Sequence, residues 1–368
     1  MSIQGFSGMY EFDNKTIPEL QAILNLMLYN TRVNRQILAI KAHPVLNAFK
    51  SMGAMNENAS ANPIETVLET DLSENVKKLD GLDDEVLSSD QEDAELAYVD
   101  YEHITDTVVV NANKFTRLKG DAAVDNYIKR KFRKILVSAP YKMAKCAVDE
   151  TISGADDVFT GLDSYITTSA GTVMNINQST AKNSEGIAYW DNQRKTSATW
   201  SESGTSDAIK LIGACNDLTG LGSVDLILYN NEAWYAYQEE LSAKGLLEQS
   251  DGKLVRKMQD AGLESLGLLG IPFIREPNMK ISSNTALTKG RGYFINSKHF
   301  KLQVVKQAFP ANVQSGAAEF ATWLGRLSDF EKISATKYNW ISIIDIWATF
   351  WTDYLAKNGV HIITSATT

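Results

Sequence analysis

The sequence is poor in the residues that build metal and redox sites. Cys146 and Cys215 are its only cysteines, and neither belongs to a CxxC or Cys/His pattern. Its four histidines are scattered, without HxH or HxxxH spacing. A disulfide framework and a zinc site are therefore not expected. We predict two reduced, partly buried thiols, and histidines with structural or surface roles.

Signatures of catalysis and of cofactor binding are also missing. There is no GxSxG elbow, and the stretch Gly262–Gly267 lacks the following Lys-Ser or Lys-Thr of a phosphate-binding loop. The acidic residues between Asp80 and Asp93 could attract a divalent cation, but they do not follow EF-hand spacing. We therefore predict no catalytic residue, no cofactor, no metal site and no enzymatic activity.

Long hydrophobic runs are absent as well. The most apolar stretch, Trp340–Leu355, is interrupted by Asp345 and Asp353, well short of the roughly 20 apolar residues that cross a membrane. The N-terminus lacks a cationic start followed by an apolar core, so a secretory signal is not expected. These features predict a protein that folds in a cytoplasm and does not enter a membrane.

Charge is the most distinctive property that the sequence does have. The segment from Asp71 to Glu102 contains twelve acidic residues and only two lysines. The segment from Lys114 to Lys145 contains ten basic residues and only two aspartates. Two large, opposite charges on one chain suggest surfaces that meet, within one molecule or between copies. The alternative, which the charges alone do not disfavour, is a solvated acidic loop beside an ordinary basic helix face.

Size and composition indicate a folded protein of more than one subdomain. A chain of 368 residues exceeds the size at which a single core stops growing. Apolar residues make up 44% and charged residues 22%, which is typical of globular proteins. The net charge of −9 argues against a protein that wraps nucleic acid, because that affinity depends on excess Lys and Arg.

Helical and extended segments are expected in the N-terminal third. Thr16–Glu19 is a capping box, and the apolar spacing after it predicts a helix to about Ala42, since Pro44 prevents simple continuation. Ser51–Pro63 is small and polar and is interpreted as a linker. Thr66–Leu118 has strand-like ends around its acidic middle. It predicts a long two-stranded excursion that needs another surface for stability.

A single long helix is expected over Asp121–Ser153. Its apolar residues, including Cys146, fall on one stripe, and its length would be roughly 50 Å. Pro140 lies inside it and removes a backbone hydrogen bond, so a bend is predicted there.

From Gly161 onward, short helices and strands are expected to alternate. The predicted elements are a helix from Ser206 or Asp207 to Leu218, a buried strand Val224–Asn230, a helix Glu232–Lys244, a strand Gly270–Glu276, strands within Arg291–Lys306 around a turn at Asn296 and Ser297, the Trp-rich segment Asn339–Leu355, and a hairpin turn at Asn358 and Gly359.

This order of elements resembles the major capsid proteins of tailed bacteriophages, whose fold is shared with encapsulins and the herpesvirus capsid floor. Local sequence agrees: GLLGIPFIREPNM, followed by GYFINSKHFKL, looks like the family's axial-domain passage, as does DLILYNNEAWYAY before it, and NGVHIITS looks like the usual last strand. The resemblance implies an α+β protein of the phage major-capsid fold, with an N-terminal arm, an extended β-hairpin loop, a long spine helix, a peripheral domain and an axial domain.

The resemblance also implies a division of the chain. Residues 1–62 would form the N-terminal arm with its helix, and residues 63–118 the extended loop. Residues 119–170 and 307–357 would form the peripheral domain with the spine helix. Residues 171–306 and 358–368 would form the axial domain.

The implied function is that of a major capsid protein. It would self-assemble into hexamers and pentamers of an icosahedral phage head that encloses double-stranded DNA without sequence-specific binding. A scaffolding protein and a portal are the other expected partners, and the virion, assembled in the host cytoplasm, is the expected location. The residues predicted to pair between subunits are Asp83, Asp84, Glu85, Glu92 and Asp93 with Lys129, Arg130, Arg133 and Lys134.

Three alternatives stay open at this point. An encapsulin-type nanocompartment shares the fold but encloses cargo enzymes. A cytoplasmic α/β enzyme could use the acidic loop as a lid, and a deep pocket lined by His299 or His361 would favour it. A tail or other virion structural protein would form tubes or rings instead of closed shells.

Overall fold

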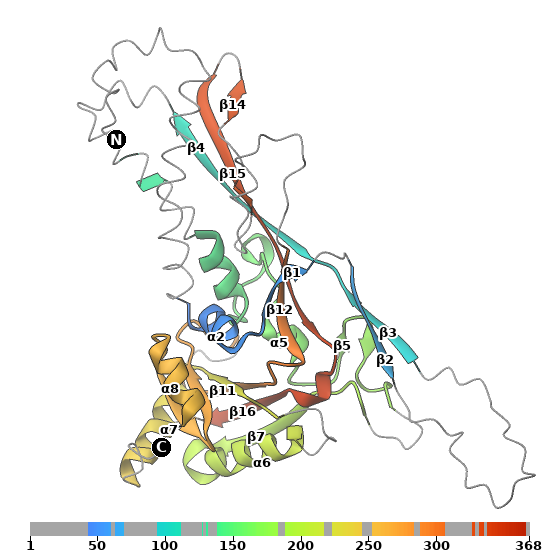
Figure 1. Cartoon of the computed structure of the whole chain (residues 1–368). Helices are drawn as coiled ribbons and strands as arrows, with labels where there is room; N and C mark the ends of the chain where they lie inside the picture. The colour runs from blue at the N-terminus through green and yellow to red at the C-terminus, as the bar shows by residue number, and fades with distance from the viewer. Residues whose placement is uncertain are drawn as a thin grey trace, which may run out of the picture.

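The computed structural model describes residues 43–59, 63–69, 94–111, 127, 130–131, 138–182, 188–216, 223–244, 252–282, 288–305, 326–327, 331–334 and 337–365. These residues form a mixed α+β structure (Figure 1).

Among the described residues the principal helices are α2 (Pro44–Met52), an unlabelled helical stretch over residues 138–146, α5 (Leu162–Tyr165), the π-helix η3 (Trp200–Gly204), α6 (Thr205–Asn216), α7 (Asn231–Ala243) and α8 (Lys253–Asp260), with short 3-10 turns η2 (Gly154–Asp156) and η6 (Leu355–Lys357).

The strands are β1 (Met55–Ala59), β2 (Ile64–Glu69), β3 (Ala94–Val99), β4 (Glu102–Asn111), β5 (Thr172–Val173), β6 (Ile176–Asn177), β7 (Gln193–Thr199), β8 (Leu226–Tyr229), β9 (Ser265–Leu268), β10 (Ile271–Arg275), β11 (Gly290–Ile295), β12 (Phe300–Val305), β13 (Arg326–Leu327), β14 (Glu331–Ser334), β15 (Lys337–Thr352) and β16 (Gly359–Ser365).

Two six-stranded sheets organise the body. In one, the strand order is β7-β16-β11-β8-β10-β9, and β8 pairs in parallel with β10 and antiparallel with β11. In the other, the long strand β15 pairs with β4, β12, β13 and β14, and β1 joins β12 in parallel. Two small ladders, β2–β3 and β5–β6, lie outside these sheets.

Strand β8 is buried on both faces of its sheet. Leu226 and Leu228 belong to the larger core cluster, which also holds residues of α2 and α8, whereas Ile227 and Tyr229 belong to a second cluster with α6 and α7. A strand covered on both faces needs a continuous apolar run, and LILY provides it. Gly292 of β11 lies against the Tyr229 ring, where an added Cβ would clash at 2.2 Å.

Several predicted elements are confirmed. The structure places α6, β8, α7 and β10 within or close to the expected ranges, and β11 and β12 flank the turn predicted at Asn296 and Ser297. The helix expected between Thr16 and Ala42 lies outside the described residues. Pro44 does not merely end a helix, because it occupies the first turn of α2, where its missing N–H costs nothing.

Other predictions were wrong about which segments form strands or about which strands pair with each other. Ser51–Pro63 is not simply a linker, since it contains the end of α2 and the strand β1, which pairs with β12. The extended ends of Thr66–Leu118 do not pair with one another: β2 pairs with β3, and β4 pairs with β15. Local alternation identifies strands, but it does not specify which distant strand each one meets.

The end of the long helix and the predicted turn at Asn358 and Gly359 also differ from the sequence-based predictions. The helical stretch ends at Cys146 and does not reach Ser153. There Asp149 accepts hydrogen bonds from Thr151 and forms a parallel bridge with Lys280, which draws the chain out of the helix. Asn358 and Gly359 form no hairpin turn, because β15 and β16 belong to different sheets.

Candidate inter-subunit surface

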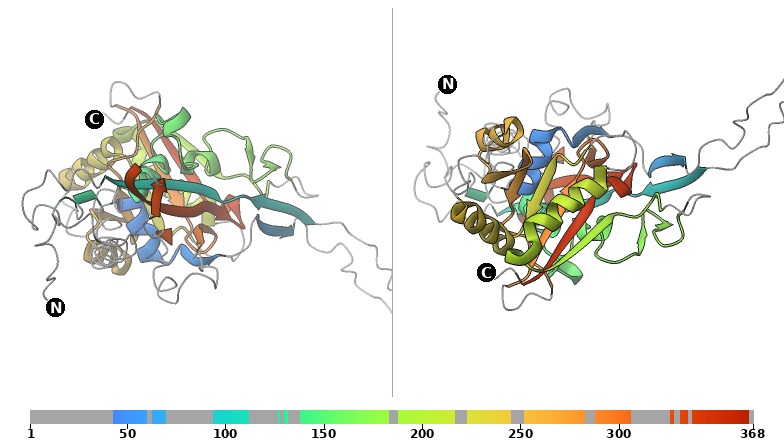
Figure 2. Two further views of the ribbon diagram at one scale, coloured as in Figure 1. Left: turned by 90° about the horizontal axis from the view of Figure 1, so that it is seen from above. Right: turned by 90° about the horizontal axis from the view of Figure 1, so that it is seen from below.

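The outer face of the β2–β3 ribbon carries three exposed apolar or aromatic side chains, Val67, Leu96 and Tyr98. The two strands pair antiparallel with Val67 opposite Leu96 and Glu65 opposite Tyr98, so these four side chains share one face. The exposed fractions are 65% for Val67, 48% for Leu96 and 45% for Tyr98. The ribbon projects from the body in all three views (Figures 1 and 2). Clustered apolar side chains on a projecting strand pair are typical of a protein contact site.

The opposite face of the ribbon is bound to the body. Leu68 is 5% exposed and Ala97 is fully buried, and both belong to the larger core cluster. On the same face, Glu95 accepts a hydrogen bond from the Tyr189 hydroxyl at 2.9 Å. An isolated two-stranded ribbon is at best marginally stable in water, so this inner face is what holds it in place.

The junction between β3 and β4 is also fixed. Tyr101 is buried, which raises the pKa of its phenol to about 12. The carboxylate of Glu102 accepts the backbone N–H of Thr160 at 2.7 Å and also bonds the Thr160 hydroxyl. Burial raises the pKa of Glu102, and these hydrogen bonds oppose that shift. The chain therefore passes from the ribbon into the β4–β15 ladder through an anchored corner.

A surface depression of about 410 Å³ lies at the base of the ribbon. His299 Nδ1 and Asp353 Oδ1 are 2.8 Å apart on its wall, and Val67, Tyr189 and Tyr354 contribute further lining. This is the pocket that a His299-based enzyme would use. It is formed partly by the ribbon, so any partner that covers the ribbon's outer face would also reach its rim.

His361 occupies a different environment. Its ring nitrogens contact the Tyr229 hydroxyl at 2.5 Å and the Ser197 hydroxyl at 2.8 Å, and Ser197 donates to Asp207 at 2.8 Å. His361 is fully buried, which lowers its pKa to about 4, with the nearby Asp207 opposing the shift. In a catalytic triad the acid orients the histidine, whereas here it binds the serine. This cluster therefore serves the packing of β16.

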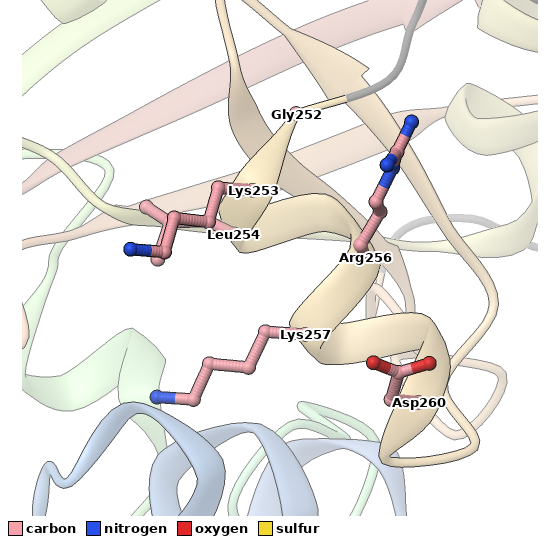
Figure 3. A pocket seen from close by; sticks show the side chains of 6 residues that line it. All are labelled: Gly252, Lys253, Leu254, Arg256, Lys257 and Asp260. Carbon is pink, nitrogen blue, oxygen red and sulfur yellow. The ribbon is translucent and has the colours of Figure 1, made fainter.

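A basic surface lies along α8. Lys253 and Lys257 are four residues apart, and Figure 3 shows both extending toward the same space, while Arg256 points away from them. The depression beside them has a volume of about 720 Å³ and is also lined by Gly252, Leu254 and Asp260. Sequence analysis overlooked this surface, although the i, i+4 lysine spacing was a visible signal.

The structure describes few of the charged residues that were predicted to pair between subunits. Arg130 is helical and exposed. The other eight, Asp83, Asp84, Glu85, Glu92, Asp93, Lys129, Arg133 and Lys134, lie outside the described residues. Pro140 is helical and buried, but the bend predicted there depends in part on residues 132–137, which the structure does not describe. The pairs remain a prediction.

Residues that sequence analysis did not single out form the contact surface that can be described. The signal was the alternation of apolar and polar residues in IETVLE and AELAYV. It identified a strand in the first segment without showing which face would be covered. Both cysteines are buried and free, as predicted.

Comparison with known proteins finds similar structures but no similar sequence among family models or curated proteins. No protein-family model and no curated protein matches the sequence. The structure is similar to the capsid of cyanophage A-1(L), with a TM-score of 0.60 and 10% identity over 86% of this chain and 92% of that chain. It is also similar to the holo-SrpI encapsulin complex from Synechococcus elongatus, with a TM-score of 0.50 and 10% identity over 87% and 89% of the two chains.

The resemblance drawn from sequence is therefore confirmed as a likeness of fold. The chain has the fold that phage capsid proteins and encapsulins share.

Proposed function

We propose that the chain is the major capsid protein of a phage, which self-assembles into hexamers and pentamers of an icosahedral head around double-stranded DNA. The observation that carries this proposal is the β2–β3 ribbon. It has no core of its own, its inner face is bound to the body, and its outer face exposes Val67, Leu96 and Tyr98. A ribbon of this kind, on a chain with the capsid fold, is best explained by a neighbouring copy that covers the outer face.

A division of the chain accompanies this proposal. The sheet β7-β16-β11-β8-β10-β9 supports an axial domain, because all its strands fall within residues 171–306 and 358–368. The β15 sheet supports a peripheral domain, but it also contains β1 from the range assigned to the N-terminal arm, β12 from the axial range and β4 from the extended-loop range. We assign β1, β12 and β4 to the peripheral sheet and keep 63–101 as the extended loop.

Further copies of the chain are the principal partner. A scaffolding protein and a portal are proposed as further partners, with assembly in the host cytoplasm and the virion as the final location. The net charge of −9 suits a wall beside packed DNA that it does not bind tightly. Among the described residues, no helix is long and apolar enough to cross a membrane.

An encapsulin-type shell is the second candidate, since an encapsulin complex is among the similar structures. The enclosed content separates the candidates: nucleic acid supports the phage head and a protein cargo supports the nanocompartment. An enzyme is not favoured, because His361 is fully buried and the His299 depression lies partly on the ribbon. We propose that the chain has no catalytic function.

Assembly tests the proposal. The chain, expressed with its natural neighbouring proteins, is expected to form closed particles of hundreds of kilodaltons or more in sedimentation and negative-stain microscopy. Val67→Lys with Leu96→Lys should leave a soluble, folded subunit that no longer forms particles. Ile209→Lys, at an exposed apolar residue of α6, is the control and should assemble. Monomers or dimers alone from the unchanged chain would contradict the proposal, and tubes would favour a tail protein.

A further inference from the structure

The short β5–β6 hairpin has a two-residue turn that places a methionine, as well as an asparagine, in the left-handed conformation. Val173 pairs with Ile176, so Met174 and Asn175 are the two turn residues, and both have positive φ, 48° and 64°. Two-residue hairpins favour this conformation, and asparagine adopts it readily. A methionine in the left-handed region is strained, because its Cβ comes too close to the following carbonyl oxygen. The hairpin tolerates this strain and presents Asn175 at its tip.

The Asn175 amide binds the edge of the ribbon. Its Nδ2 donates to the carbonyl of Leu96 at 3.1 Å, and its Oδ1 accepts the N–H of Tyr98 at 3.0 Å. The two backbone groups belong to residues i and i+2 of β3, which is the spacing that a paired strand would use. One side chain therefore takes the place of a neighbouring strand on that edge of the ribbon.

The hairpin is itself anchored to the core. The indole N–H of Trp190, which is fully buried, donates to the Val173 carbonyl at 3.0 Å. After β6, the buried Gln178 accepts the N–H of Gly171 at 2.8 Å and donates to Asn192 at 2.9 Å. Both ends of the hairpin are thus held, so its tip is a fixed point relative to the body.

We propose that Asn175 is the positioning residue that fixes the direction in which the β2–β3 ribbon leaves the body. This rests on the proposed function, because the direction matters only where the ribbon must meet a neighbouring copy. The ribbon's apolar inner contacts, at Leu68 and Ala97, are non-directional, because the hydrophobic effect has no preferred direction. The directional contacts of β3 described above are the Tyr189–Glu95 hydrogen bond on the inner face and the two bonds of Asn175 on the edge. The two amide hydrogen bonds are directional, and a slip along β3 would break both.

Asn175→Gly separates this role from folding. Glycine accepts the positive φ at no cost, so the turn is kept or stabilised while both hydrogen bonds are lost. Asn177→Ala is the matched control, because Asn177 lies in the same hairpin and, among the described contacts, its side chain bonds only to the near neighbour Ser179. The measurements are amide hydrogen exchange in the unassembled subunit and particle diameter after assembly.

In Asn175→Gly, exchange of the Tyr98 amide should become about tenfold faster than in the unchanged chain, while exchange at Ile227 in β8 stays unchanged. Particles should be fewer or heterogeneous in diameter, and Asn177→Ala should match the unchanged chain in both respects. Unchanged Tyr98 exchange would mean that these bonds do not hold β3 in place, which overturns the proposal, and so would faster exchange with particles of normal yield and diameter. Failure of the unchanged chain to assemble would refute the proposed function, while the exchange result would still test the bonds.

Discussion

The carboxylate of Glu276 caps the first turn of α2 from 231 residues further along the chain, because its Oε2 accepts the backbone N–H of Val45 at 2.8 Å. The helix does not cap itself: His43 at the N-cap makes no side-chain bond to it, and Pro44 has no N–H to offer. Asn278 donates two further hydrogen bonds to Oε1 of Glu276. This buried carboxylate therefore joins the start of α2 to the end of β10.

Glu276 should make folding stability depend on pH. Burial raises its pKa from 4.5 to about 7, with its hydrogen bonds opposing the shift. Between these values the folded subunit binds a proton that the unfolded chain does not, so its stabilising contribution is full below pH 4.5 and is lost as the pH rises through 7. The change is on the order of 3 kcal/mol. Urea unfolding of the unassembled subunit at a series of pH values measures it.

Glu276→Gln removes this titration. The variant should lose the decrease in stability between pH 4.5 and 7 that Glu276 contributes, while Glu239→Gln on the exposed face of α7 should keep it. An unaltered pH profile in Glu276→Gln would show that Glu276 is ionised throughout this range.

His361 should act in the opposite direction. Burial lowers its pKa from 6.5 to about 4, so the unfolded chain binds the proton first, and stability is lost as the pH falls from 6.5 through 4. The two effects overlap and partly cancel in the unchanged chain. Glu276→Gln should therefore reveal a steeper loss in acid, and His361→Gln should remove that loss. Equal acid sensitivity of the unchanged chain and His361→Gln would contradict the assignment.

The two thiols should be unreactive in the folded subunit. Cys146 and Cys215 are buried, and burial raises the pKa of both, to about 12 for Cys215, with Lys357 opposing the shift there. The thiolate is the reactive form, so a thiol reagent at neutral pH should label neither residue quickly without denaturant and both in urea. Rapid labelling under native conditions, or particles that dissociate when reductant alone is added, would show this prediction wrong.

The sequence predicted individual elements well where the local signal was strong. The apolar run in β8, the amphipathic spacing of α6 and α7, and the turn at Asn296 and Ser297 all have local causes. Pairing across the chain could not be predicted in the same way. Nothing local in TDTVVVNAN distinguishes a partner in β2 from one in β15, which lies more than 200 residues later.

Contacts between distant segments show the same limit. The motif EPNM was recognised as part of a family pattern, but its chemistry, a buried carboxylate held by Asn278 and bonded to Val45, depends on a distant helix. The Asn175 contact likewise joins residues 77 and 79 positions apart. The predicted charged pairs rest on composition alone, and the structure describes only Arg130 among them.

Charge reversal tests whether the acidic and basic segments meet between subunits. If they do, changing Asp83, Asp84 and Glu85 together to Lys should leave a soluble, folded subunit that assembles poorly. Each exposed pair contributes only roughly 0.2 to 1 kcal/mol, but every subunit repeats the array. Changing Arg130, Arg133 and Lys134 to Glu in the same chain should partly restore assembly, because the opposite charges then face each other again.

Salt provides an independent check on the same contact. The Debye length falls to about 3 Å at 1 M salt, so exposed pairs lose most of their attraction. Assembly of the unchanged chain should weaken between 0.1 M and 1 M salt, and the charge-reversed chain should lose its defect relative to it at high salt. Particle yield, measured by sedimentation at each salt concentration, decides the matter. Normal assembly of the triple Lys variant at low salt would mean that the two segments do not meet across subunits, and that the acidic segment is a solvated loop.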